Sequence, residues 1–188
     1  MVAKLFKKST MAIGPIMIEI IDESKFEYLD CKVKQLKIKL PFEIDTSKMY
    51  LGIDPGTVNL GIAVSYPFGI ELYEAKIVRS DDPVQRITFA QRILKACINT
   101  FMDGAIAVIE SSAFSQSYRQ TELAEVRASY VLWCIDHAIT PIMVNPGTIR
   151  KFVFGSGKTK AEAYWKELPP NSASALACML YAMDVQLV

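Results

Sequence analysis

Residues 49–66 contain two short apolar runs that are separated by a tight turn. The first run ends on Asp54, Pro55 and Gly56 then turn the chain, and the second run starts at Leu60. This pattern predicts two adjacent strands of a hairpin, with Asp54 at the end of the first strand. A carboxylate among apolar residues is costly unless it is paired or bound to a metal. Asp54 is therefore a candidate metal ligand, although Asp-Pro-Gly is also an ordinary turn sequence.

Another apolar run, residues 105–109, ends in a carboxylate in the same way. Glu110 follows the run directly, and Ser111 and Ser112 mark the point where a strand would stop. Hard cations such as Mg²⁺ bind oxygen ligands and often use one or two carboxylates together with substrate phosphate. Two strands that each carry one acid at the end suggest a paired-carboxylate metal site, formed here by Asp54 and Glu110.

These two segments resemble the acidic motifs of a known nuclease family. Residues 51–64 are similar to the first-strand motif of RuvC-type Holliday junction resolvases, which belong to the RNase H-like superfamily. Val-Ile-Glu ending at Glu110, with Phe114 after it, resembles the second acidic motif and its following aromatic residue. The resemblance spans roughly residues 49–184 and implies an RNase H-like fold.

The resemblance also implies a function. It suggests a metal-dependent, structure-selective endonuclease that cuts phosphodiesters in branched DNA, such as a four-way junction, during DNA recombination and repair. The implied cofactor is Mg²⁺ or Mn²⁺, and the implied assembly is a homodimer. By the same resemblance, Phe114 stacks on or wedges between bases, with core packing as the alternative. The superfamily also contains RNA-processing factors and inactive members, so an RNA substrate and a non-catalytic role stay open.

The chain departs from the family pattern on its last helix, where family members carry an Asp-x-x-Asp pair. The matching positions are Asn171 and Ser174, aligned by the Ala-Leu-Ala that follows. Positions i and i+3 share a helix face, but neither side chain supplies a charge. Three accounts stay open: a catalytic site completed by Asn171 and Ser174 beside Asp54 and Glu110, a relative that binds branched nucleic acid or serves in assembly without cutting, or a deliberate Asp-to-Asn change.

One concentrated basic patch lies in residues 148–166, where five Lys or Arg stand against one Glu. The family has a similar Gly-x-Gly and lysine segment that touches DNA. By resemblance, Lys151, Lys158 and Lys160 are candidate phosphate contacts, with Arg150 less secure, while ordinary solvated lysines are the alternative. The spacing of a P-loop is not met, which argues against ATP binding.

Composition limits the remaining possibilities. The net charge of the 188 residues is +1, so any basic surface for nucleic acid has to be local. The four cysteines show no CxxC pair and are expected to be reduced core residues. No apolar run is long enough to span a membrane, and no signal peptide is recognised. We expect a cytoplasmic protein, or a virus or plasmid product made in the cytosol, with no membrane partner.

The order of predicted elements indicates an α/β protein with a mixed sheet flanked by helices. The RNase H-like domain is expected at residues 49–188, with a helix that is capped by Asp82. Residues 1–48 are expected to be an N-terminal extension, a small β appendage. We predict three strands there, at residues 16–21, 25–30 and 33–40. The appendage could pair into the main sheet, make a dimer contact or lay its lysines on nucleic acid, but a solvated strand face is the plainer interpretation.

Overall fold

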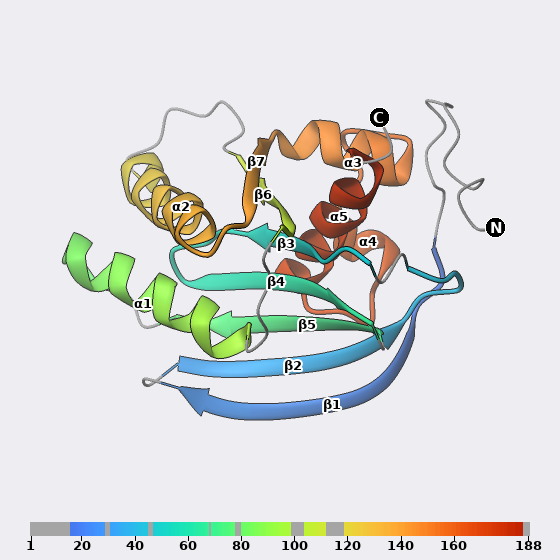
Figure 1. Cartoon of the computed structure of the whole chain (residues 1–188), viewed down its shortest axis with the longest axis horizontal. Coiled ribbons are helices and arrows are strands. Elements are labelled where there is room, and N and C mark those ends of the chain that lie inside the picture. The colour runs from blue at the N-terminus through green and yellow to red at the C-terminus, as the bar shows by residue number, and fades with distance from the viewer. Residues whose placement is uncertain are drawn as a thin grey trace.

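The computed structural model describes residues 16–28, 31–44, 47–67, 69–77, 80–98, 104–111 and 119–185. These residues form a seven-stranded sheet with helices packed on it (Figure 1). The strands are β1 (Glu19–Tyr28), β2 (Cys31–Lys39), β3 (Tyr50–Asp54), β4 (Asn59–Tyr66), β5 (Gly69–Lys76), β6 (Ile106–Glu110) and β7 (Thr140–Val144). The helices are α1 (Pro83–Cys97), α2 (Arg119–Asp136), α3 (Pro146–Phe154), α4 (Ala161–Tyr164) and α5 (Pro170–Val185).

The sheet is mixed, with the strand order β1-β2-β5-β4-β3-β6-β7. Strands β1 to β5 pair with their neighbours in antiparallel fashion, whereas β6 pairs parallel to β3 and β7 pairs parallel to β6. Parallel neighbours need a crossover connection, and α2 supplies one between β6 and β7. The predicted α/β class, a mixed sheet flanked by helices, is confirmed.

Two apolar clusters cover the two faces of the sheet. One joins α3, α4 and α5 to alternate residues of the strands, and the other joins α1 and α2 to the remaining residues. Figure 1 shows α1 and α2 together, away from α3, α4 and α5. Helix α5 lies closest to the sheet because Gly52 and Gly61 face it. A Cβ atom at either glycine would overlap the backbone of α5, at Ala175 and at Asn171 respectively.

The N-terminal strands differ from the prediction. Residues 16–21 and 25–30 do not form two strands, because Glu19–Tyr28 is one continuous strand, β1. The polar residues 22–24 resemble a turn in the sequence, but in the structure they pair with Lys37, Leu36 and Gln35 of β2. An edge strand tolerates such polar residues since much of it is exposed to water. Strand β2 then pairs with β5, so the hairpin continues the main sheet.

Two local predictions are confirmed, one on the start of α1 and one on the cysteines. Asp82 caps α1 by accepting a hydrogen bond from the backbone N–H of Val84 at 2.9 Å, and Pro83 is the first helical residue. The four cysteines are buried and free. No helix within the described residues is long and apolar enough to cross a membrane.

Candidate functional site

The two predicted acids lie at the ends of neighbouring strands. Asp54 is the last residue of β3 and Glu110 is the last residue of β6. These strands run parallel, and Ile53 pairs with Ile109, so the next residue of each strand emerges at the same end of the sheet. Both side chains lie on the face that α5 covers, because they continue the alternation of Gly52 and Val108. The structure therefore brings Asp54 and Glu110 together.

Burial makes these carboxylates costly to ionise. Burial, followed by the charges of Glu110 and Glu74, raises the pKa of the Asp54 carboxyl well above its usual range. Burial also raises the pKa of Glu110. Desolvated carboxylates that repel one another are stabilised by a positive charge placed between them. The pair is thus suited to binding a cation.

Helix α5 supplies the remaining predicted site residues. Ser174 hydrogen-bonds to the Asp54 carboxyl, which favours the charged form of that group. Asn171 has a different contact: its side-chain Nδ2 donates a hydrogen bond to Oε1 of Glu74 at 2.6 Å. Of the two helix positions, therefore, Ser174 contacts the strand acids, whereas the amide of Asn171 is held by a third carboxylate.

That third carboxylate, Glu74 on β5, was not among the predicted site residues. Its Oε2 accepts hydrogen bonds from the backbone N–H of Ser172 at 2.7 Å and from the hydroxyl of the same residue at 3.2 Å. Glu74 thus satisfies free donors in the first turn of α5, where a negative charge is favoured. A signal was present in the sequence: Ile70, Leu72 and Glu74 alternate along one strand face, as the apolar residues before Asp54 do.

Two arginines stand near the acid pair. Arg127 of α2 donates from Nε to the backbone carbonyl oxygen of Glu110 at 3.1 Å, which ties α2 to the end of β6. The positive charge of Arg150, on α3, lowers the pKa of both Asp54 and Glu110 and partly opposes the effect of burial. Arg150 was predicted only as part of the basic patch, but in the structure its charge also acts on the acid pair.

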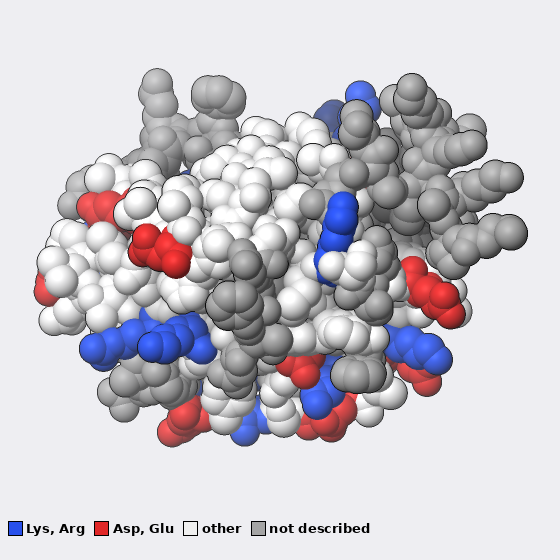
Figure 2. All heavy atoms as spheres, viewed as in Figure 1, with Lys and Arg blue, Asp and Glu red and all other residues white. Residues whose placement is uncertain are grey.

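The other residues that were predicted to contact nucleic acid lie outside the group of residues around Asp54 and Glu110. Lys151 is exposed on α3, Lys158 lies in the turn after that helix, and Lys160 precedes α4. Lys160 pairs with Glu162 at 3.8 Å on the surface. Phe114 lies outside the described residues. Among the residues coloured in Figure 2, positive and negative side chains are intermixed along the lower edge, where β1 and β2 lie in Figure 1.

The donor set fits a divalent cation held by few protein ligands. Within the described residues, no group of three or more His, Cys, Asp or Glu side chains is arranged to hold a metal ion. Asp54 and Glu110 nevertheless offer two partly buried carboxylates with raised pKa, and Ser174 adds a hydroxyl oxygen. Mg²⁺ commonly uses only one or two carboxylates and fills its remaining positions with water and phosphate oxygens. The residues present are compatible with that mode of binding.

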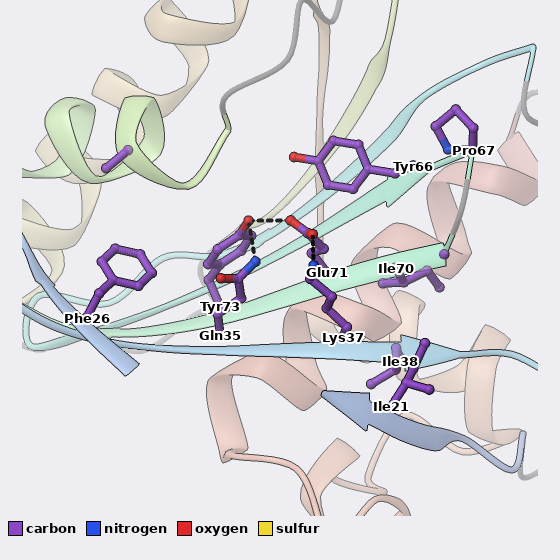
Figure 3. Close-up of a pocket in the computed structure, with 12 residues that line it drawn as sticks. Ile21, Phe26, Gln35, Lys37, Ile38, Tyr66, Pro67, Ile70, Glu71 and Tyr73 are labelled. Atoms are coloured by element: carbon purple, nitrogen blue, oxygen red, sulfur yellow. Dashed lines mark hydrogen bonds and ion pairs between the residues drawn. The ribbon is translucent and has the colours of Figure 1, made fainter. Parts of the chain in front are cut away.

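A cavity of about 690 Å³ on the opposite face of the sheet has a different character (Figure 3). Gln35 donates to the hydroxyl of Tyr73 at 3.3 Å, and that hydroxyl donates to Glu71 at 2.6 Å. Lys37 pairs with Glu71 at 3.6 Å. Because these polar groups satisfy one another, the cavity offers no convergent set of free ligands. The acid pair remains the better candidate site.

Comparison with known proteins identifies the fold. No protein-family model matches the chain, and no curated protein matches it in sequence. A structure of Thermus thermophilus RuvC matches with a TM-score of 0.56 and 16% identity, over 74% of this chain and 96% of that one. A second, of T. thermophilus RuvC in complex with Holliday junction substrate, matches with a TM-score of 0.53 and 13% identity over the same shares. The chain has a RuvC-like fold, as its motifs predict.

The contact between Asn171 and Glu74 leads to a testable prediction. We expect Asn171→Asp to lower the free energy of unfolding by about 1–3 kcal/mol, because it removes a hydrogen bond and sets two carboxylates against each other. In the double variant Asn171→Asp/Glu74→Gln, amide and carboxylate exchange places and the bond can form again. A double-mutant cycle from urea unfolding should then give a favourable coupling of about 1 kcal/mol or more. Additive losses would show that the two side chains do not interact.

Proposed function

We propose that this chain is a metal-dependent, structure-selective endonuclease that cuts phosphodiesters in branched DNA. The observation that carries the proposal is the partly buried pair of Asp54 and Glu110 at the ends of two neighbouring parallel strands. The RuvC-like fold supports it, since a protein of that fold has been seen with a Holliday junction substrate. We further propose that the chain acts as a homodimer in DNA recombination and repair, because a four-way junction has two-fold symmetry.

In this proposal Asp54 and Glu110 would hold Mg²⁺ or Mn²⁺, and a bound ion would supply activation of water and neutralisation of charge on the phosphate. Ser174 orients the Asp54 carboxyl through its hydrogen bond and favours the ionised form, in opposition to the effect of burial. Arg150 contributes positive charge beside the acids, where it can pair with a substrate phosphate. Phe114 stacks on or separates bases near the branch point. Lys151, Lys158 and Lys160 contact phosphates of the arms.

A second candidate is a non-catalytic protein that binds branched nucleic acid. It is favoured by the contact at Asn171, whose amide is engaged by Glu74, so that α5 directs no carboxylate of its own at the strand acids. Two-metal phosphoryl chemistry places cations about 4 Å apart and uses several carboxylates to hold them. Among the described residues, Asp54 and Glu110 are the strand-end acids and Glu74 is bonded to α5, so the chain can retain binding while losing cleavage.

Cleavage of a synthetic four-way DNA junction separates the two candidates. We expect the wild-type chain to cut the junction when Mn²⁺ or Mg²⁺ is added, and to prefer it over linear duplex of the same sequence. Glu110→Gln, which keeps the shape of the side chain and removes its charge, should abolish cutting while junction binding persists. Binding without cleavage at any concentration of either metal would support the second candidate and remove the enzymatic one.

A further inference from the structure

Lysines of the N-terminal hairpin, formed by β1 and β2, belong to the same cross-strand row of the sheet as Asp54. Directly paired residues of neighbouring strands lie on one face of a sheet. One such row runs from Lys25 on β1 through Lys34, Glu74 and Gly61 to Asp54 on β3. The sheet face that carries the proposed catalytic acid therefore continues onto the hairpin that the family motifs do not include, with the first turn of α5 packed over Gly61 and Glu74 between the two.

The adjoining row adds further positive charge to the same face. Glu27 pairs with Lys32, Lys32 pairs with Lys76, and Lys76 pairs with Asn59. The residues of the two rows other than Gly61 and Asp54 line a hollow of about 620 Å³. We refer to the four basic residues as the lysine cluster: Lys25, Lys32, Lys34 and Lys76.

The lysine cluster is unfavourable for folding by itself. Lys25 stands directly opposite Lys34, and Lys32 stands directly opposite Lys76. Like charges in such cross-strand positions are destabilising. Acidic residues compensate this repulsion in part: Glu23 lies 3.1 Å from Lys34 and 3.6 Å from Lys25. Glu27 also stands opposite Lys32, and Glu74 opposite Lys34. Within the described residues, Lys32 and Lys76 have no ion-pair partner. An arrangement of this kind is stabilised by an anionic partner.

From these observations we propose that the lysine cluster binds the sugar-phosphate backbone of one arm of the branched DNA substrate. The inference rests on the proposed function and extends it by naming the surface that holds the arm. Strands in a sheet lie about 4.8 Å apart, so β5, β2 and β1 lie about 10, 14 and 19 Å from β3. Phosphates of one DNA strand are spaced by about 3.4 Å along the helix axis. The lysines therefore contact phosphates roughly three to six nucleotides from the cleaved bond.

The test compares two double variants of β2 and its neighbour. Lys32→Ala/Lys76→Ala removes two charges from the lysine cluster. Lys37→Ala/Lys39→Ala removes two charges from the same strand β2 but from its opposite face, and serves as the matched control. Binding of each full-length variant to a fluorescent four-way junction is measured in EDTA over a range of salt concentrations, and cleavage is measured separately with Mn²⁺.

We expect the cluster variant to bind the junction about tenfold more weakly than wild type, with a salt dependence reduced by about 1.8 in log–log slope. The control should bind as wild type does. Thermal unfolding should show a cluster variant at least as stable as wild type, because like-charge repulsion is removed. If that variant does not fold, Lys25→Ala/Lys34→Ala replaces it and the same expectation holds.

The outcomes distinguish this inference from the proposed function. If wild type cuts the junction and the cluster variants bind it with unchanged affinity and salt slope, the inference is overturned while the nuclease proposal stands. If cluster and control variants lose affinity equally, the effect is one of net charge and the inference is likewise overturned. If wild type neither binds nor cuts branched DNA, both proposals fail together.

Discussion

Asp54→Asn is expected to abolish metal-dependent cleavage and, at the same time, to stabilise the metal-free protein. Loss of groups that only orient metal ligands costs about 10–100-fold in affinity or activity, so loss of a ligand itself should cost at least about 100-fold. The stability gain follows from burial of the carboxylate beside Glu110 and Glu74, which makes its charged form costly. The amide keeps the size of the side chain and removes that charge. Titration with Mn²⁺ and junction cleavage measure the first effect, and urea unfolding measures the second.

The raised pKa values also predict the direction in which the free energy of unfolding changes with pH. Asp54, Glu74 and Glu110 all have a pKa raised mainly by burial. A carboxyl whose pKa is higher in the folded state contributes stability that is complete below the unfolded-state pKa of about 4 and is lost as the pH rises through the folded-state value. In EDTA, the free energy of unfolding should therefore fall from about pH 4 towards neutral pH. This fall should be smaller in Asp54→Asn.

The control for this experiment is Asp22→Asn, which removes an exposed carboxylate from β1. We expect it to leave cleavage, metal binding and the pH profile unchanged. If Asp54→Asn were destabilising at neutral pH in EDTA, Asp54 would be satisfied by its protein neighbours and would not be held ready for a cation. Unchanged cleavage in Asp54→Asn would exclude it as a metal ligand.

The second large effect is expected at Gly52, where β3 meets α5. In Gly52→Ala the new methyl group would overlap the carbonyl oxygen of Ala175, and the nearest atoms also include the backbone nitrogen of Met179. Backbone atoms of a packed helix cannot move individually to relieve this overlap, so α5 has to shift as a whole. We expect a loss of about 3 kcal/mol or more in the free energy of unfolding. For a chain of this size that corresponds to a melting temperature lower by about 10 °C.

Gly104→Ala is the matched control for Gly52→Ala. A Cβ atom at Gly104 meets nothing within 4 Å, but its φ of 73° is strained for alanine. The expected cost is therefore about 1–2 kcal/mol, from backbone conformation alone. Urea unfolding measures both variants. If Gly52→Ala lowered the free energy of unfolding no more than Gly104→Ala, α5 would not pack tightly against β3. Because α5 carries Ser174 and Asn171, Gly52→Ala should also weaken metal binding.

Local pattern was sufficient to locate the strand acids. Asp54 and Glu110 each follow a run of apolar residues and precede residues that end a strand, and these signals lie within a few positions along the chain. The α/β class and the cap of α1 at Asp82 follow from equally local signals. Each can be predicted from sequence because neighbouring residues alone determine it.

Tertiary structure alone decided that Glu74 joins the residues around those acids. Asn171 meets Glu74 across 97 positions of the chain. Alternation along a strand indicates which residues share a face, but not which strand lies beside it or in what register. The polar residues 22–24 illustrate the same limit, because they resemble a turn locally and become part of β1 only through pairing with β2.

By itself, then, the sequence determined two acids, their strands and the fold class of this protein. The pairing of β2 with β5 and of β5 with β4 determined the rest: the placement of Glu74 beneath the first turn of α5 and the alignment of the lysine cluster with Asp54. Strand pairing depends on contacts between residues far apart in the chain, which compete with many alternative pairings and leave little local trace.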